Sequence, residues 1–415
     1  MLIVLVVSAI FALGQPQAAT LEEGSSPIRI IIGPQPDIGS QSDIGSQPEI
    51  NKAVIAPSPS QFTYDVGGTL IYDVVRYQGY HSLQGLTTGY TSESGFRRAR
   101  LAIDGALYGD WEYDVGLNFT DAINLLGSNS TGQIFRPSYS ISYSGFSKVE
   151  IAGGQISEPF SLEGATSSSD ITFMERGLPH AFSPPSNLGI RISAAPTKEF
   201  YLAVGGFTED PRNINNLKKS FTGRVAYAPI HTKNRILHLG TMASYRLLKD
   251  RRQRYRSRAE SSLTPAWFTT GTIGDVDRVV LTGLETAAVW GSVSVQTEYE
   301  RADISLGDGD QRRRVDGYYV YASWFLTGES RPYKNGSFDS IKPKNGSGAW
   351  EVAVRNSAIN DRINNGSKMS DITLGLNWYI NKYARLMANY VYVNHKKDNV
   401  HGNARIFQMR GQIDF

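Results

Sequence analysis

The chain has 415 residues, with 42 Lys and Arg against 39 Asp and Glu, so its formal net charge is only +3. This length fits two or three ordinary soluble domains or one large repetitive architecture. Cysteine is absent, which excludes disulfide staples and thiolate metal sites.

The chain begins with a strongly apolar run, MLIVLVVSAIFAL. Small residues follow it, so residues 1–19 resemble a secretory signal peptide, although no Lys or Arg precedes the apolar run. Residues 20–65 contain DIGSQ twice and are rich in Pro, Ser and Gln, a composition that predicts a disordered periplasmic segment. No later run reaches 18 apolar residues, which argues against a spanning helix but leaves a membrane β-barrel open.

Residues 66–415 alternate between apolar and polar side chains with a period of two. GTLIYDVV, DGYYVYASWFL and DITLGLNWYI each give one apolar face. A soluble sandwich would also alternate, but many runs here span about ten residues, the length of a tilted strand that crosses a bilayer. Aromatic residues collect near the ends of the runs, and short turns alternate with long polar loops. The last run, FQMRGQIDF, ends on the aromatic residue of its apolar face, Phe415, as expected of a bacterial outer-membrane barrel.

The pattern therefore predicts an all-β fold, a transmembrane antiparallel β-barrel with pore-folded loops in the outer membrane. About sixteen runs can be counted, which is enough for an aqueous lumen. They begin near residues 67, 96, 111, 132, 148, 188, 199, 219, 235, 278, 291, 314, 348, 369, 382 and 404.

The second run, FRRARLAIDGAL, carries the first candidate pore residues. Arg98 and Arg100 lie on the parity opposite to Leu101, so we expect both to point into the lumen. The outward alternative would cost about 2–4 kcal/mol per charge at mid-membrane. Arg97 falls on the outward parity and would reach the pore only near the rim or across a β-bulge.

The segment LLKDRRQRYRSR (247–258) follows the ninth run and begins a long loop on the outer side. Arg254, Arg256 and Arg258 are spaced two residues apart, so an extended backbone places the three guanidinium groups on one side. Such a row suits an anion that passes from one guanidinium to the next. A solvated loop, or one that binds lipopolysaccharide phosphates, is the alternative. We expect no nucleic-acid partner, because the loop faces the outside of the cell.

Four separated blocks resemble, in the correct order, the phosphate-selective porin O and P family. The resemblance implies a homotrimer of sixteen-stranded barrels that passes small anions, such as phosphate, polyphosphate or chloride, across the outer membrane. Its surroundings would be outer-membrane lipid and lipopolysaccharide. The resemblance also implies that the loop within the second block folds into the pore. The blocks lie at 96–119, 153–179, 318–355 and 374–393.

The chain departs from the family pattern at the constriction. The family combines the FRR arginines with an Arg in the first strand, a Lys and serines in the pore-folded loop, and an acid in the fourth strand. Here Thr69 stands in the first strand, the pore loop has no Lys, and Arg136 stands for the acid. The serines remain, as Ser168 and Ser169. We expect anion preference to survive, and a general or weakly anion-selective porin without phosphate specificity is the alternative.

Enzymes form the competing class. The sequence has no Walker loop, dinucleotide fingerprint, nucleophile elbow or metal-ligand cluster, so we expect neither catalysis nor a cofactor. A structural barrel without conductance would need a plugged lumen. The residues expected to line the pore or bind anions are Arg97, Arg98, Arg100, Arg136, Arg251, Arg252, Arg254, Arg256, Arg258, Ser168 and Ser169.

Overall fold

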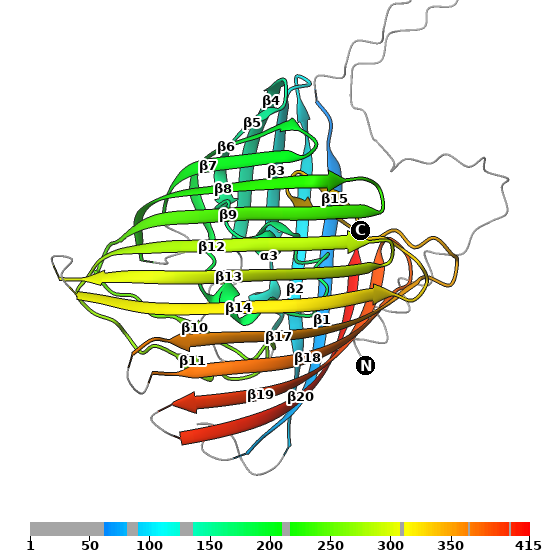
Figure 1. Ribbon diagram of the computed structural model, residues 1–415. Coiled ribbons are helices and arrows are strands. Elements are labelled where there is room, and N and C mark those ends of the chain that lie inside the picture. The colour runs from blue at the N-terminus through cyan, green and yellow to red at the C-terminus, as the bar shows by residue number, and fades with distance from the viewer. Residues whose placement is uncertain are drawn as a thin grey trace, which may run out of the picture.

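The computed structural model describes residues 62–80, 90–124, 136–209, 216–307, 311–363, 366–397 and 400–415. The predicted signal peptide, and the predicted leader up to residue 61, lie outside these residues. Within the described part of the chain, sixteen strands form one closed antiparallel barrel in sequence order (Figure 1). The barrel closes where β1 pairs with β20. The predicted fold class is confirmed.

Each of the sixteen predicted runs corresponds to one barrel strand, the largest offset being a start at 91 instead of 96. The first strand begins one residue before the predicted boundary at 66. The barrel strands are β1 (Asp65–Tyr80), β2 (Thr91–Leu107), β3 (Trp111–Asn118), β4 (Arg136–Phe146), β5 (Val149–Ser157), β6 (Ser186–Thr197), β7 (Phe200–Thr208), β8 (Leu217–His231), β9 (Arg235–Leu248), β12 (Val276–Trp290), β13 (Val293–Leu306), β14 (Gln311–Phe325), β17 (Ala349–Asp361), β18 (Lys368–Tyr379), β19 (Ala384–Lys397) and β20 (Val400–Asp414).

The two ends of the barrel differ in the length of their connections. One end, which we call the turn side, carries mostly tight turns such as 108–110. The other end, the loop side, carries the long connections 158–185 and 249–275. The connections contain α2 (Thr120–Asn124), α3 (Leu162–Ala165), η1 (Leu178–Ala181), the hairpin of β10 (Arg256–Ser257) with β11 (Phe268–Thr269), and the hairpin of β15 (Tyr333–Lys334) with β16 (Ser337–Phe338). Among the described residues, no helix is long and apolar enough to cross a membrane.

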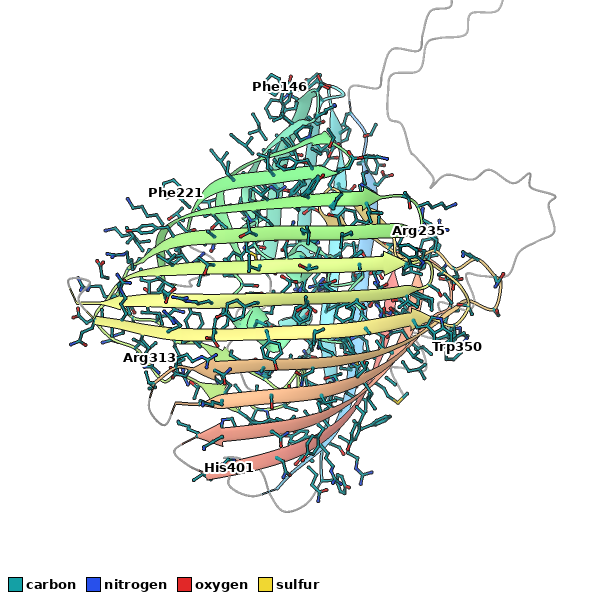
Figure 2. The ribbon with its side chains drawn as sticks, in the orientation of Figure 1. Phe146, Phe221, Arg235, Arg313, Trp350 and His401 are labelled. Atoms are coloured by element: carbon teal, nitrogen blue, oxygen red, sulfur yellow. The ribbon has the colours of Figure 1, made fainter. Side chains whose placement is uncertain are left out.

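The outward face of the barrel is apolar across many strands. Val354, Leu374, Tyr390 and Phe407 lie side by side on β17 to β20, and all four are exposed. At the turn side, Trp350 stacks on a neighbouring Trp with 5.2 Å between the ring centroids (Figure 2). An exposed apolar band with aromatic residues at its edge is stable in lipid and unfavourable in water.

The inward face is less polar than the sequence pattern predicts. Near the loop side, Val391, Val393 and Ile406 point into the barrel and are buried. Tyr255 and Trp267, from the connection 249–275, belong to the same buried cluster. Strands that are apolar on both faces therefore mark the part of the wall on which a loop packs from inside.

The C-terminal residue closes the seam of the barrel. The backbone N–H of Phe415 donates to the carbonyl of Gly68 at 3.0 Å, and the N–H of Gly68 donates back at 2.8 Å. Deleting Phe415 should lower the amount of folded barrel in the outer membrane at least about fivefold, because two net-favourable hydrogen bonds are lost together with the terminal ring. Heat-modifiable electrophoresis of membrane fractions measures this amount, with Phe415→Tyr as the control. Equal amounts of the truncated and full-length barrel would contradict the expectation.

Candidate functional site

Three connections fold into the barrel and narrow its lumen. The pore loop is residues 158–185, between β5 and β6, and it carries α3. The basic loop is residues 249–275, between β9 and β12. The turn-side hairpin is residues 326–348, between β14 and β17. Figure 1 shows α3 inside the barrel, behind its front wall.

The pore loop is fixed to the opposite wall by buried polar contacts. The N–H groups of Leu162 and Glu163, at the start of α3, donate to the carboxylate of Glu298 on β13 at 2.9 and 2.7 Å. A carboxylate at a helix start satisfies N–H groups that have no partner within the helix. The side chain of Ser161 accepts from Gly164 at 2.9 Å and caps the same turn.

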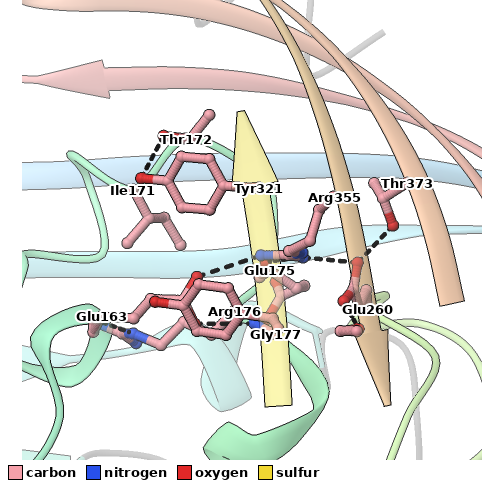
Figure 3. Close-up of polar contacts among 12 residues, drawn as sticks. Glu163, Ile171, Thr172, Glu175, Arg176, Gly177, Glu260, Tyr321, Arg355 and Thr373 are labelled. Atoms are coloured by element: carbon pink, nitrogen blue, oxygen red, sulfur yellow. Dashed lines mark hydrogen bonds and ion pairs between the residues drawn. The ribbon is translucent and has the colours of Figure 1, made fainter. Parts of the chain in front are cut away.

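Arg355 of β17 connects the pore loop and the basic loop to one strand (Figure 3). Its guanidinium donates to the carboxylate of Glu163 at 3.2 Å and to the carbonyl of Glu175 at 2.8 Å, both in the pore loop. It also forms an ion pair of 2.6 Å with Glu260 of the basic loop. Arg355 is 1 % exposed, so each of these contacts replaces a lost contact with water.

The turn-side hairpin supports the pore loop from the other end of the barrel. Arg331 forms a buried ion pair with Glu351 of β17, and it donates to the carbonyl of Asp170 at 3.3 Å. Phe338 packs against Leu162 of the pore loop. The inward fold of this hairpin is not predicted from the sequence, because RPYKNGSF has the composition of an ordinary surface turn.

Two large cavities lie inside the barrel among the residues that the structure describes. The outer cavity, about 720 Å³, lies between the pore loop and the basic loop. The turn-side cavity, about 870 Å³, lies along the wall of the early strands. Four residues line both cavities and therefore lie at the boundary between them, which we call the neck. The neck consists of Arg98, Ser168, Arg176 and His180.

The neck has an excess of positive charge. Arg98 points inward, as its parity predicts, and donates to the hydroxyl of Ser168. Arg176 donates through Nε and Nη2 to the carbonyls of Glu163 and Thr166, both at 2.9 Å. Carbonyls orient a guanidinium without cancelling its charge. Neither arginine forms an ion pair with a carboxylate in the part of the chain that the structure describes.

The protonation states of the pore-loop residues in the neck follow from burial. Burial lowers the pKa of Arg176, and the charges of Glu163 and Glu175 oppose this shift. The guanidinium stays charged at neutral pH because the ordinary pKa of arginine is above 12. Burial and the charge of Arg176 lower the pKa of His180 well below its ordinary value, so His180 is neutral.

A β-bulge turns Arg97 into the barrel. Ile71 faces Arg98 and Tyr72 faces Phe96, which leaves Arg97 as the extra residue. Its guanidinium donates to both oxygens of Glu175, at 2.7 and 3.0 Å. The interpretation that a bulge re-aims Arg97 agrees with this register. Arg97 lines the outer cavity, but as one member of an ion pair.

Glu175 is the centre of a small network. It also accepts from Arg410 of β20 at 2.8 Å, and Arg410 in turn pairs with Asp73 of β1 at 2.7 Å. Burial raises the pKa of the Glu175 carboxyl, but Arg97 and Arg410 outweigh burial and leave the pKa below its ordinary value. The carboxylate is therefore ionised and neutralises part of the outer cavity.

Arg100 lines the turn-side cavity but is paired. Its Nη2 donates to both oxygens of Asp114, at 2.8 and 3.0 Å. Arg191 pairs with Glu150 at 2.9 Å in the same cavity. Positive and negative charges are thus interleaved beyond the neck.

The basic loop has the alternation that its spacing predicts. Arg254, Arg256 and Arg258 are exposed, whereas Tyr255 between the first two is buried and Ser257 between the last two is half-buried. The structure brings Arg256 and Arg258 to the outer cavity. Arg254 lies apart from that lining and donates to the hydroxyl of Thr269 at 3.4 Å.

Arg251 and Arg252, at the start of the basic loop, lie away from the cavities. Arg251 pairs with Asp275 at 2.6 Å. Arg252 is exposed, and its carbonyl accepts from the side chain of Asn216 at 2.7 Å. Neither lines the outer cavity.

Ser169 and Thr69 dock the pore loop on the barrel seam. Both hydroxyls donate to the carboxylate of Asp414 on β20, Ser169 at 3.1 Å and Thr69 at 2.9 Å. Arg136 begins β4 opposite Asn118. The side chain of Arg136 lies outside the described residues.

Arg176 and Arg410 are not among the pore residues predicted from the sequence. Arg176 is the only Lys or Arg in the pore loop, which is the signal that could have identified it once the family Lys was found to be absent. Arg410 lies on the polar parity of the last run, so its inward direction followed from the sequence. Its ion pair with Glu175, 235 residues away, did not.

A closed sixteen-stranded barrel with an apolar outer face, inward-folded loops and a basic neck is the architecture of an outer-membrane porin. The comparison with protein families agrees. The chain belongs to the phosphate-selective porin O and P family, whose model matches residues 65–415. The predicted family, the outer-membrane location and the class of anion channel are therefore confirmed.

Two relatives align over most of the chain. Porin O of Pseudomonas aeruginosa is 29% identical over 388 residues, which cover 84% of this chain and 86% of that protein. An uncharacterised protein of Caulobacter vibrioides is 28% identical over 355 residues, which cover 79% of this chain and 68% of that protein.

Solved structures support the fold. The anion-selective porin from Comamonas acidovorans superposes with a TM-score of 0.56 at 14% identity, over 85% of this chain and 100% of that one. The outer-membrane channel DcaP of Acinetobacter baumannii gives a TM-score of 0.54 at 11% identity, over 86% and 99%.

Proposed function

We propose that this protein is a passive channel for phosphate and related small oxyanions, and that the neck is its selectivity site. The observation that carries the proposal is the pair Arg98 and Arg176, two guanidinium groups without carboxylate partners among the described residues, beside the hydroxyl of Ser168. The planar donors of arginine match phosphate oxygens, and the guanidinium charge does not titrate near neutral pH.

The arrangement supports a graded path. Arg256 and Arg258 draw anions into the outer cavity, and Arg98 and Arg176 replace part of the hydration shell at the neck. Apart from the two neck arginines, each arginine that lines the turn-side cavity has an acid beside it, as in the pair of Arg100 with Asp114. Affinity therefore falls beyond the neck, and the anion leaves.

A general, weakly anion-selective porin is the second candidate. It is favoured by Thr69, which stands where the family has an arginine and holds Asp414 near the pore loop. Phosphate block of chloride current in a planar bilayer separates the two. Block at submillimolar phosphate supports the oxyanion channel, whereas chloride current that is indifferent to phosphate supports the general porin.

We also propose that the channel is a homotrimer surrounded by outer-membrane lipid and lipopolysaccharide. Membership of the porin family supports the trimer, and the apolar outer band supports the lipid contact. A heat-labile species of three times the monomer mass in native electrophoresis is the expected result. A monomer in mild detergent would contradict it.

Replacing Arg256 and Arg258 by Gln should lower anion conductance at low salt more than about twofold and change it little at 1 M. The Debye length falls from about 30 Å at 0.01 M to about 3 Å at 1 M, so fixed charge at the mouth attracts ions only in dilute salt. Single-channel conductance over this range is the measurement. The matched control replaces Arg251 and Arg252, which lie outside the cavity. Equal losses of conductance in the two double variants would show that Arg256 and Arg258 do not attract anions more than other arginines of the basic loop do.

A further inference from the structure

The outward face at the loop side of β17 to β20 contains a hollow of about 510 Å³. The strand register places its residues in two rows that run across the four strands. We call this hollow the rim groove. The row nearest the loops is Asn360, Lys368, Lys396 and His401, and the row below it is Ala358, Ser370, Asn394 and Asn403.

The rim groove interrupts the aromatic girdle of the barrel. In the lower row, β13 and β14 contribute Tyr299 and Tyr318, and the next residue on β17 is Ala358. Small and polar side chains continue across β18 to β20. His401, in the upper row, lies at the opposite end of this wall from Trp350 (Figure 2). The groove therefore lies at the level where lipid head groups meet the outer edge of the barrel.

Below the rim groove, the wall becomes apolar over two rows. The next row is Asn356, Ile372, Tyr392 and Arg405, so its apolar part lies on β18 and β19. The row after that is Val354, Leu374, Tyr390 and Phe407. Ile372, Leu374 and Phe407 are each between 46 and 52% exposed. A molecule that occupied the groove would thus have an apolar surface beneath it on β18 and β19.

Two lysines give the groove positive charge. Lys368 and Lys396 face each other directly across β18 and β19, and like charges opposite each other destabilise a sheet. Both are exposed, and neither has an ion-pair partner within the described ranges. Other cations near this rim have acidic partners. Arg362 pairs with Asp316 at 2.8 Å, and Arg301 pairs with an aspartate at 2.7 Å.

We propose that the rim groove binds the phosphorylated sugar head group of lipopolysaccharide. A phosphate between Lys368 and Lys396 relieves their repulsion, and the side chains of Asn394 and Asn403 offer hydrogen bonds to sugar hydroxyls. The acyl chains then lie on the apolar strip below. The volume falls within the range of small-ligand sites, roughly 300–1,000 Å³. A second copy of the chain fits less well, because a stable interface has an apolar centre.

The test compares Lys368→Gln/Lys396→Gln with a matched pair at the turn side, Lys233→Gln/Lys382→Gln. The purified full-length protein is titrated with lipopolysaccharide and with chemically dephosphorylated lipopolysaccharide, and bound lipid is counted by native mass spectrometry. The rim pair should weaken binding of the phosphorylated lipid roughly thirtyfold, since each lysine near a charged head group contributes a few-fold to tenfold. The turn-side pair should bind as the wild type does.

Removing the lipid phosphates should lower the affinity of the wild type by about the same factor and leave the affinity of the rim variant almost unchanged. Dephosphorylation and the lysine substitutions remove the same interaction, so their effects should not add. Conductance at 1 M salt should stay at the wild-type value, since neither lysine faces the lumen, so this result is independent of the proposed conduit. Wild-type lipid binding by the rim variant would overturn the proposal. An altered oligomer distribution of that variant without lipid would also overturn it and would assign the groove to a protein interface.

Discussion

Arg98→Glu should lower the ratio of anion to cation permeability at least about tenfold. The substitution changes the charge of the neck by two units, at a residue that lines both cavities. A unit charge about 6 Å from a passing ion contributes roughly 2–3 kcal/mol at an effective dielectric constant near 20, which exceeds the 1.4 kcal/mol of a tenfold change. Reversal potentials of single channels in a potassium chloride gradient measure the ratio.

Two further variants make the Arg98 result specific. Arg98→Gln removes one unit of charge and should give an intermediate ratio. Arg235→Glu makes the same reversal on the outward face, where Arg235 lies over the ring of Trp290 at 4.1 Å, and should leave the ratio unchanged. A wild-type ratio in Arg98→Glu would place the ion path away from the neck.

Arg355→Met should destabilise the barrel by about 3–5 kcal/mol and make the channel noisier and more conductive. The substitution leaves Glu163 and Glu260 as buried carboxylates without their shared cation, and removing one partner of a buried ion pair has a cost of this size. It also releases the pore loop and the basic loop from β17. The midpoint of urea unfolding reports the stability, and open-channel current noise reports the release.

A rescue variant separates charge from packing at this position. Adding Glu163→Gln and Glu260→Gln to Arg355→Met removes the unpaired charges and should recover most of the lost stability. Arg301→Met, at an outward ion pair with Asp303, should change stability by less than about 1 kcal/mol. If Arg355→Met unfolded at the wild-type midpoint, Arg355 would not be the attachment point of the loops.

The sequence predicted the barrel because period two and strand length are local properties. The same local reasoning predicts that Arg98 and Arg100 face the lumen, and both line the turn-side cavity. It failed to predict which arginines are neutralised, because a partner such as Glu175 lies 78 residues from Arg97 and reaches it only after the pore loop folds. Charge in the pore therefore depends on loop placement, which the strand pattern does not determine.

The sequence indicates the inward folding of the loops less clearly than it indicates the barrel strands. Val391 and Val393 are apolar on the face that a simple channel would keep polar, and the basic loop covers them. The sequence of the turn-side hairpin does not indicate its inward fold. Arg331 is a residue typical of exposed turns, and its buried ion pair with Glu351 is known only from the structure. Hydrophobic residues on both faces of a barrel strand are the more useful sequence indicator of a loop folded inside.

The reversal potential of the wild-type channel in a tenfold gradient of potassium phosphate tests the central claim most directly. If Arg98 and Arg176 select oxyanions at the neck, the reversal potential should have the sign of an anion current and approach the Nernst limit for phosphate, about 59 mV per decade divided by the charge of the carried ion. A reversal potential near zero, or one with the sign of a potassium current, would contradict an anion-selective neck.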